Sequence, residues 1–440
     1  MTPHQTTQRL FSRAGLAIVT AALLATVVSA APPEGSPYSL PQPAFFGQVR
    51  PRTELDHKGL YDTSSNKSLL STHVRTRLGF TATPSLAVQL KVELQDTRVF
   101  GTEPGGAGAP HAASVGNRQG VDLLQGYIAV TEGPVTTVLG RQKMQLGAGR
   151  YLSTLEWHPY SRAFDGLSAN WSMENADLTA FTFVVSDSLA TVTGDRLVLS
   201  GLHYNRQMSE NLTVEVSGFH DQSRLRTAYS GDSSTRYDLL VLGQRVVGKA
   251  GLFTFEEEFM YQAGKVHYAG ASKNSAAWQL GLRAGVALPS NLKANIGVDA
   301  MSGDKDATDD KNTLWRANYN FGHAYFGWMD YFLANPRFGV IDYRADVSAP
   351  VWKGETRAAT LLAQYHYFTP QNAPSGSDKP YGQEIDAELH LSLYPRSNIV
   401  LGAGVFLPGD NAFRLPAAKL ANGQKDGPGY FLYFMPVFNF

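Results

Sequence analysis

The 440-residue chain has no cysteine, and this absence excludes disulfide bridges, thiolate metal sites and cysteine nucleophiles. It has no excess charge of either sign, because 38 Lys and Arg residues balance 38 Asp and Glu residues. This balance argues against a nucleic-acid partner, which a strongly basic domain would favour. After residue 30 the sequence lacks any apolar run of about 18 residues, the length that a membrane-spanning helix needs. Helical membrane spans are therefore not expected.

The first 30 residues have the parts of a secretory signal peptide. Arg9 and Arg13 form a short basic region, residues 14–28 are uncharged and mostly apolar, and small residues follow as a cleavage site. The apolar part is too short to cross a bilayer as a helix. We therefore predict a signal peptide over 1–30 and a single exported domain over 31–440, since no change in composition marks a further boundary.

Apolar and polar residues alternate along many segments of the exported part. In residues 86–95 every even position is apolar, while the odd positions from 89 onward carry Gln89, Lys91, Glu93 and Gln95. Side chains of a β-strand alternate between two faces, whereas a helix would scatter these residues around its circumference. The pattern recurs in 70–80, 253–261, 278–288 and 384–393. These segments are predicted to be strands with one apolar and one charged face.

The connections between the predicted strands are of two kinds. Some are short turns, such as 83–85, 132–134 and 289–291, and others are long stretches rich in Gly, Ser, Asp and Asn, at 101–120, 263–275, 302–312 and 408–428. Outer-membrane barrels have short turns at one end and long loops at the other, and about 18 strands can be counted here. We therefore predict an all-β fold, a transmembrane antiparallel β-barrel in the outer membrane of a Gram-negative bacterium.

Two soluble folds are the alternatives. A β-sandwich or a β-propeller would also show alternation, but a propeller repeats at a period of about 40 residues and no such repeat is present. The charged face of strand after strand needs water or paired charges around it, which a wide polar lumen supplies.

The last segment is rich in aromatic residues. Residues 430–440 carry aromatics at alternate positions and end at Phe440. This segment resembles the C-terminal strand that the outer-membrane assembly machinery recognises in its client barrels. We expect that machinery as a partner through this strand, and outer-membrane lipid and lipopolysaccharide as the surroundings of the barrel. A hydrophobic last strand without a role in recognition is the alternative.

Three groups of motifs resemble the alginate-export family of outer-membrane proteins. They are GRQKMQLGAGR at 140–150 with Trp157 and RAFDG at 162–166; SGDK at 302–305 with GHAYFGW at 322–328 and Asp330; and GQEID at 382–386 with FLPG at 406–409. The resemblance implies a barrel of about 18 strands. In alginate exporters the lumen is lined by arginine and lysine, which attract the carboxylates of an acidic polysaccharide.

The resemblance makes Arg141, Arg150, Arg162 and Asp165 pore-side candidates. Arg141 stands at the end of a predicted strand, and the irregular stretch that follows it contains Arg150 and Arg162. Irregular backbone is tolerated at membrane depth only where it lines a cavity or is buried in protein. We therefore expect this stretch to fold into or over the lumen. Alternatively, Arg162 and Asp165 pair with each other to hold it.

Alternation alone adds further charged residues on polar faces. The pore-lining or substrate-binding candidates from this pattern are Arg50, Arg52, Arg75, Arg77, Lys91, Arg283, Glu384 and Asp386, and the same faces carry Glu54, Glu93, Glu256, Glu258, Lys293, Asp299 and Glu388. Rings of basic side chains select anions and rings of acidic ones select cations. Because 50–77 is basic while 256–258 and 384–388 are acidic, we expect an electric field across the lumen.

No motif for catalysis or cofactor binding was found. The sequence has no G-x-S-x-G and no H-E-x-x-H, and the acidic segment 302–310 lacks the spacing of a calcium loop. We predict a passive outer-membrane channel of the alginate-export type for an acidic polysaccharide or for small hydrophilic or anionic solutes, with no cofactor or metal and no enzymatic activity. The alternatives are a general porin for solute uptake, a barrel-embedded hydrolase and a structural barrel with a plugged lumen.

Overall fold

The computed structural model describes residues 43–57, 69–100, 120–187, 196–229, 232–268, 271–306, 308–316, 318–373, 377–415 and 427–440. The predicted signal peptide lies outside the described residues, as do most of the predicted loops 101–120 and 408–428. Among the described residues, no helix is long and apolar enough to cross a membrane.

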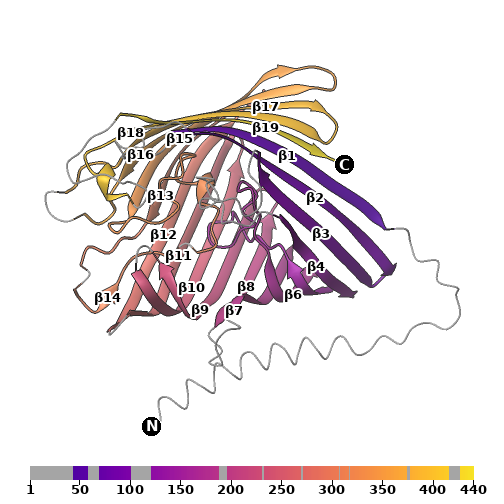
Figure 1. Cartoon of the computed structure of the whole chain (residues 1–440), viewed down its shortest axis with the longest axis horizontal. Helices are drawn as coiled ribbons and strands as arrows, with labels where there is room; N and C mark the ends of the chain where they lie inside the picture. The colour runs from indigo at the N-terminus through magenta and orange to yellow at the C-terminus, as the bar shows by residue number, and fades with distance from the viewer. Residues whose placement is uncertain are drawn as a thin grey trace, which may run out of the picture.

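Within this described part, 18 antiparallel strands form a closed barrel, which confirms the predicted fold class. Figure 1 shows the strands following one another around the barrel in chain order, with β1 (indigo) beside β19 (yellow). The strands are β1 (Ala44–His57), β2 (Leu69–Ser85), β3 (Val88–Val99), β4 (Gly120–Glu132), β5 (Val135–Gln142), β6 (Phe164–Met173), β7 (Ala176–Asp187), β8 (Arg196–Ser209), β9 (Leu212–Tyr229), β10 (Asp232–Ala250), β11 (Phe253–Tyr268), β12 (Ala271–Ala287), β13 (Lys293–Met301), β15 (Val340–Lys353), β16 (Ala358–Thr369), β17 (Gly382–Tyr394), β18 (Ser397–Pro408) and β19 (Gly429–Asn439).

The remaining elements are short. The two-residue strand β14 (Lys311–Asn312) pairs in parallel with β12, while β13 pairs directly with β15. The 3-10 helices η1 (Gly322–Ala324) and η2 (Ala412–Arg414) lie in the long connections. These short elements lie in the connections between wall strands, so the wall itself is continuous past them.

The barrel closes between its first and last strands. β1 is hydrogen-bonded on one side to β2 and on the other to β19. At the seam, Gly47 and Phe440 exchange two backbone hydrogen bonds of 3.0 Å each. Because every wall strand has a neighbour on both sides, no polar backbone edge has to face lipid.

The two faces of the wall differ as the alternation predicted. On β17, Glu384 and Asp386 point inward and are fully buried, whereas Ile385 between them is 53% exposed on the outer face. Exposed apolar side chains such as Leu139, Trp171 and Leu242 continue this outer surface around the barrel. An apolar exterior with a charged interior suits a barrel surrounded by lipid.

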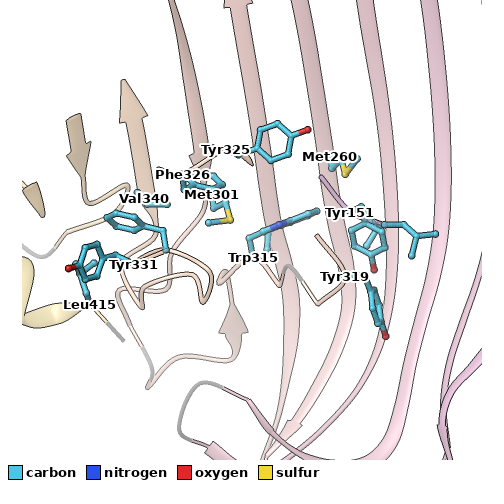
Figure 2. Packing of buried hydrophobic residues seen from close by; sticks show 14 of the residues in the cluster. Tyr151, Met260, Met301, Trp315, Tyr319, Tyr325, Phe326, Tyr331, Val340 and Leu415 are labelled. Carbon is cyan, nitrogen blue, oxygen red and sulfur yellow. The ribbon is translucent and has the colours of Figure 1, made fainter. Parts of the chain in front are cut away.

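The lumen is filled across part of its height by two long connections, here called the first inner loop (143–163) and the second inner loop (313–316 and 318–339). Figure 2 shows aromatic side chains of both loops packed inside the wall, among them Tyr151, Trp315 and Tyr325. Tyr151, for example, stacks on inward-facing Phe219 with ring centroids 4.6 Å apart. Any solute that crosses the barrel must therefore pass through the space that the two inner loops do not fill.

Candidate functional site

The two inner loops are joined to each other inside the barrel. Leu152 and Tyr319 form a parallel β-bridge, and the Ser153 N–H donates to the Tyr319 carbonyl at 2.9 Å. The Phe321 N–H donates to the Gly149 carbonyl at 2.9 Å. Together the loops form one body that crosses the lumen, so they define its constriction.

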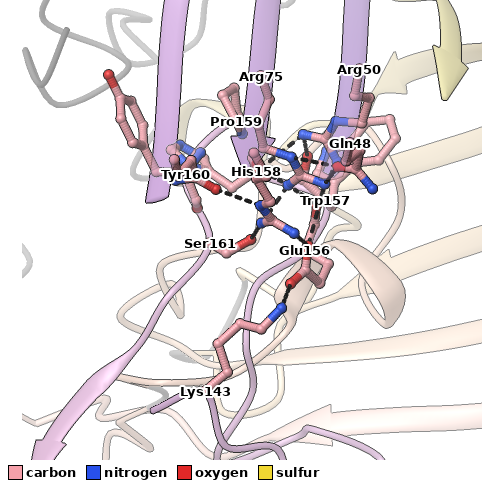
Figure 3. Close-up of polar contacts among 12 residues, drawn as sticks. Gln48, Arg50, Arg75, Lys143, Glu156, Trp157, His158, Pro159, Tyr160 and Ser161 are labelled. Carbon is pink, nitrogen blue, oxygen red and sulfur yellow. Dashed lines mark hydrogen bonds and ion pairs between the residues drawn. The ribbon is translucent and has the colours of Figure 1, made fainter. Parts of the chain in front are cut away.

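Four arginines on the inner face of β1 and β2 bind the first inner loop, and Figure 3 shows two of them, Arg50 and Arg75. Arg50 donates to the carbonyls of Glu156 at 2.6 Å and of His158 at 3.1 Å, and Arg52 donates to the Trp157 carbonyl at 2.6 Å. Arg75 also donates to the Glu156 carbonyl at 3.0 Å, and Arg77 donates to the Ser161 hydroxyl. All four arginine side chains are buried. Sequence alternation placed them on the inner face, but their partner is the loop.

The Glu156 carboxylate is the anionic centre of this contact. It lies 3.3 Å from Arg75, 3.0 Å from Arg77 and 3.0 Å from the Lys143 ammonium group. Burial opposes its charge, but Arg77, Arg75 and Lys143 outweigh that cost and lower the pKa of Glu156 from 4.5 to about 2. The ion pairs therefore hold the first inner loop against β1 and β2 over a wide range of pH.

This shift predicts how the loop responds to acid. Because the folded pKa of Glu156 is below its ordinary value, its stabilising charge is fully present above pH 4.5 and is lost as the pH falls toward 2. We expect a Glu156→Gln variant to show, already at neutral pH, the loosened loop that the wild type reaches only in acid. Single-channel conductance recorded from pH 7 to pH 3 measures this. The idea fails if both proteins respond to acid by the same amount, since other carboxylates titrate equally in each.

An aromatic stack joins the two loops on the same side of the lumen. The rings of Trp157 and His323 are parallel, with centroids 4.0 Å apart. The Arg52 guanidinium lies 4.4 Å from the centre of the Trp157 ring, and Tyr433 meets that ring edge-on at 4.9 Å. Trp157 was a family motif residue, and its position explains why a large flat side chain is needed there.

Arg150 anchors the other side of the first inner loop. Its guanidinium lies 2.6 Å from Asp299 on β13 and 3.3 Å from Glu258 on β11, and it stacks on Tyr325 at 3.8 Å. Its side chain is 1% exposed. The Asp299 carboxylate is also approached by Arg283 at 3.6 Å and by Arg344 at 3.5 Å. Arg150 therefore lies inside the barrel as a buried anchor of the first inner loop.

Two buried carboxylates on β17, Glu384 and Asp386, hold the second inner loop. The Met329 N–H donates to Glu384 at 2.8 Å, and the Trp328 N–H donates to Asp386 at 3.4 Å. Gly327 makes this approach possible: its φ is +78°, and a Cβ on it would lie 2.4 Å from a Glu384 carboxylate oxygen. The predicted pore-lining carboxylates thus bind loop backbone.

The placement of Arg141 and Asp165 corrects a prediction. Arg141 on β5 pairs with Asp165 on β6 at 2.7 Å, in register with each other. Arg141 is two residues from Leu139 and therefore lies on the same face, and Leu139 is 61% exposed on the outside of the barrel. The prediction that these two charges face the lumen is wrong, because strand pairing puts them on the outer face.

Arg162 has a different partner from the one considered. Its guanidinium donates to the Tyr319 carbonyl and to the Ser153 carbonyl, the latter at 3.4 Å. Asp165 belongs to Arg141, so the alternative of an Arg162–Asp165 pair is also wrong. Arg162 does hold the inner loops, through backbone carbonyls.

Lys91 and Arg283 remain partly accessible from the lumen. Lys91 is half-buried on the inner face of β3, with its ammonium group 5.0 Å from the centre of the Phe46 ring. Arg283 lines a cavity of about 440 Å³ at the short-turn end of the barrel, together with Lys249, Glu256 and Asn295.

Two inward-facing arginines of the wall strands, Arg245 and Arg344, were not identified from the sequence. Arg245 on β10 lies 2.6 Å from Glu215 and 3.0 Å from Glu256, and Arg344 binds Asp299. Asp342, Arg344 and Asp346 alternate in the sequence, a signal that would have found Arg344. Arg245 follows Gln244, and two adjacent polar residues give no indication of which one faces inward.

A serine, a histidine and a carboxylate also meet inside the barrel. The His203 imidazole lies 2.8 Å from the Ser217 hydroxyl and 3.9 Å from Glu215. The adjoining cavity has a volume of only about 10 Å³, room for about one water molecule. Glu215 is bound by Arg245. An acyl substrate has no space beside Ser217, so this cluster does not support the hydrolase alternative.

Comparisons with known proteins agree with this architecture. A family model described as alginate export matches residues 44–335. The barrel is similar to OccAB4 of Acinetobacter baumannii (TM-score 0.55, 10% identity, 92% of this chain and 100% of that chain). It is also similar to two Pseudomonas aeruginosa structures: OpdO (TM-score 0.58, 8% identity, 90% and 97%) and the outer-membrane protein OpdK (TM-score 0.56, 12% identity, 91% and 99%). At these identities the likeness shows the fold alone. A search of curated proteins gave no match.

Proposed function

Because the chain belongs to the alginate export family of outer-membrane proteins, we propose that it is a passive channel whose solutes are small, hydrophilic and negatively charged. The observation that carries the size limit is the joined pair of inner loops, which cross the lumen through the contacts of Ser153 and Phe321. An acidic polymer would need a wide, continuous path. The loop-covered interior supports small solutes instead.

The charge preference is supported by the wall around the first inner loop. On the inward faces of β1–β3 and around Lys143 and Glu156 of this loop, six cationic side chains stand beside four carboxylates; these are Arg50, Arg52, Arg75, Arg77, Lys91 and Lys143 beside Glu54, Asp56, Glu93 and Glu156. The arginines are buried beneath the loop, so a solute meets the lysines first. Lys91 and Lys143 are close enough to repel each other, and an anion between them relieves that repulsion.

Ion selectivity tests this proposal. We expect the refolded full-length protein to open anion-selective channels in a planar bilayer, and Lys91→Ala to lose part of that selectivity while the conductance changes little. Reversal potentials under a potassium chloride gradient give the measurement. Arg206→Ala is the matched control, because Arg206 is exposed on the outer face of β8 near the short turns.

The other outcomes separate the alternatives. Unselective or cation-selective openings would contradict the anionic solute class and favour a general porin. Saturable block of the channel by alginate fragments, relieved when a voltage drives them through, would contradict the size limit and favour the acidic polysaccharide. Absence of conductance would favour a plugged structural barrel.

A further inference from the structure

One carboxylate of β11 lies on the outer face of the barrel. Its sequence neighbours Glu256 and Glu258 form ion pairs with arginines inside the barrel, at 3.0 Å and 3.3 Å. Because strand side chains alternate between faces, Glu257 between them points outward. The next charged side chains on this face of β11 are Lys265 and His267, beside the C-terminal end of the strand. Glu257 therefore stands apart from the charges of the rim.

The strand register places Glu257 deep in the wall. A row of directly paired residues runs from Ala176, at the short turn between β6 and β7, through Glu257 to Leu407, near the end of β18 beside a long connection. The row crosses eleven wall strands, from β7 to β18, and β11 is the fifth of them. Because the strands of a barrel are tilted, such a row climbs from one rim to the other. Glu257 therefore lies near mid-height, within the band that faces lipid.

Apolar side chains surround Glu257 on this outer face. Its direct partners on the neighbouring strands are Val246 and Leu282, and its neighbours along the outer face of β11 are Phe255 and Phe259. Among the described residues, its carboxylate has no hydrogen-bond or ion-pair partner. A charged group on the lipid-facing surface destabilises a barrel at this depth. A second protein surface that covers Glu257 and donates a hydrogen bond to it would lower that cost.

A hydrogen-bond donor lies beside Glu257 on β10. Gln244 pairs with Phe259 and is exposed, so its side chain points to the same outer face. It is a diagonal neighbour of Glu257, at a distance of about 7–8 Å. With strands tilted by about 40°, one step along a row raises a residue by about 3 Å, and two residues toward the short turn lower it by about 5 Å. Gln244 and Glu257 therefore differ in depth by only about 2 Å.

A donor and an acceptor at one depth are complementary to the same two side chains on a second copy of the chain. A two-fold axis along the membrane normal, passing between them, would place each Gln244 against Glu257 of the partner subunit. Two reciprocal hydrogen bonds result, in which each amide N–H donates to a carboxylate oxygen. This reciprocity indicates a second copy as the partner.

The wall next to these two residues lets another barrel approach closely. Val214, Val216 and Gly218 follow one another along the outer face of β9. A Cβ on Gly218 would have only the Leu242 side chain within 4 Å, at 3.5 Å, so the surface is shallow there. Small side chains are frequent where membrane-embedded segments associate, because they bring the backbones together, and polar side chains form hydrogen bonds across such contacts.

We infer that the outer face of β9–β11 is the interface of a two-fold symmetric homodimer within the outer membrane, held by reciprocal hydrogen bonds between Gln244 and Glu257. Each barrel keeps its own lumen in this dimer, because the interface lies entirely on the outside of the wall. The inference depends on the membrane location of the barrel and not on which solute passes through it.

Association of the refolded full-length protein in lipid vesicles tests the inference. Because the chain has no cysteine, Ser290→Cys in an exposed short turn provides a single thiol for a donor or an acceptor dye. Energy transfer between the two labelled populations, measured over a range of protein-to-lipid ratios, gives the dimer fraction. We expect Gln244→Glu, which sets carboxylate against carboxylate, to weaken association by about 10-fold or more. The exchanged variant Gln244→Glu/Glu257→Gln should restore association, because donor and acceptor merely trade places.

Two controls keep the result interpretable. Leu401→Glu adds an outward-facing carboxylate on β18, several strands away from β10, and its association should equal that of the wild type. Unchanged conductance of each variant establishes that its barrel is intact and separates this test from the test of transport. Absence of energy transfer in the wild type, or an exchanged variant that associates no better than Gln244→Glu alone, would overturn the inference.

Discussion

Replacing Arg150 with alanine is expected to lower the free energy of unfolding by about 3 kcal/mol, because it removes the nearest counter-ion of two buried carboxylates. Asp299 is fully buried and Glu258 is 4% exposed, and Arg150 binds both. The same change should release the first inner loop from β11 and β13 and raise the channel conductance severalfold. Urea unfolding in lipid vesicles and single-channel recording measure the two effects.

Arg141 provides the matched control for this experiment. It is also an arginine paired with an aspartate, but the pair lies on the outer face with the two side chains 27% and 57% exposed. Exposed ion pairs contribute little, so Arg141→Ala should change stability by about 1 kcal/mol or less and leave conductance unaltered. If Arg150→Ala behaved like Arg141→Ala, the anchoring role of Arg150 would be refuted.

Replacing Gly327 with alanine is expected to be the second most damaging single change. A side chain in this left-handed conformation costs about 1–2 kcal/mol, and its Cβ would also collide with the Glu384 carboxylate. Crowding in a packed interior adds about 1–3 kcal/mol. The second inner loop should leave β17, and the channel should show frequent openings of higher conductance.

Gly251 provides a control that separates the cost of the left-handed backbone from the cost of the steric collision. It has a φ of +61° in the β10–β11 turn, and a Cβ there would meet nothing within 4 Å. Gly251→Ala therefore measures the backbone cost alone and should not change conductance. Equal losses of stability in Gly251→Ala and Gly327→Ala would show that the contact with Glu384 is unimportant.

The wall of the barrel could be predicted from the sequence because alternation is a local property. Arg75 and Arg77 alternate with the apolar residues Val74 and Leu78, and this alone places them on the inner face. Alternation fails at β5, where Thr136, Thr137, Gly140 and Arg141 leave both faces mixed. The apolar Leu139, two positions from Arg141, was the signal that this arginine faces outward.

The partners inside the lumen could not be predicted, because they join segments far apart in the chain through irregular backbone. The Trp157–His323 stack and the Arg162–Tyr319 hydrogen bond depend on the paths of two loops that have no repeating pattern. The sequence alone predicted which charged residues face the interior, but it predicted that they contact solutes. In the structure, most of them bind the carbonyls, amides and charges of the inner loops.

The seam between β1 and β19 sets a condition on how this molecule can form. The side chains of Gln48 and Asn439 are hydrogen-bonded although they are separated by 391 positions in the chain. Closing a loop of this length has a large entropic cost, so the contact forms late unless something holds the two ends together. Until it forms, β1 and the growing sheet each present an unpaired strand edge, which is the feature that promotes aggregation. Because β19 is synthesised after the other wall strands, both unpaired edges need protection until this eleven-residue strand has paired with β1.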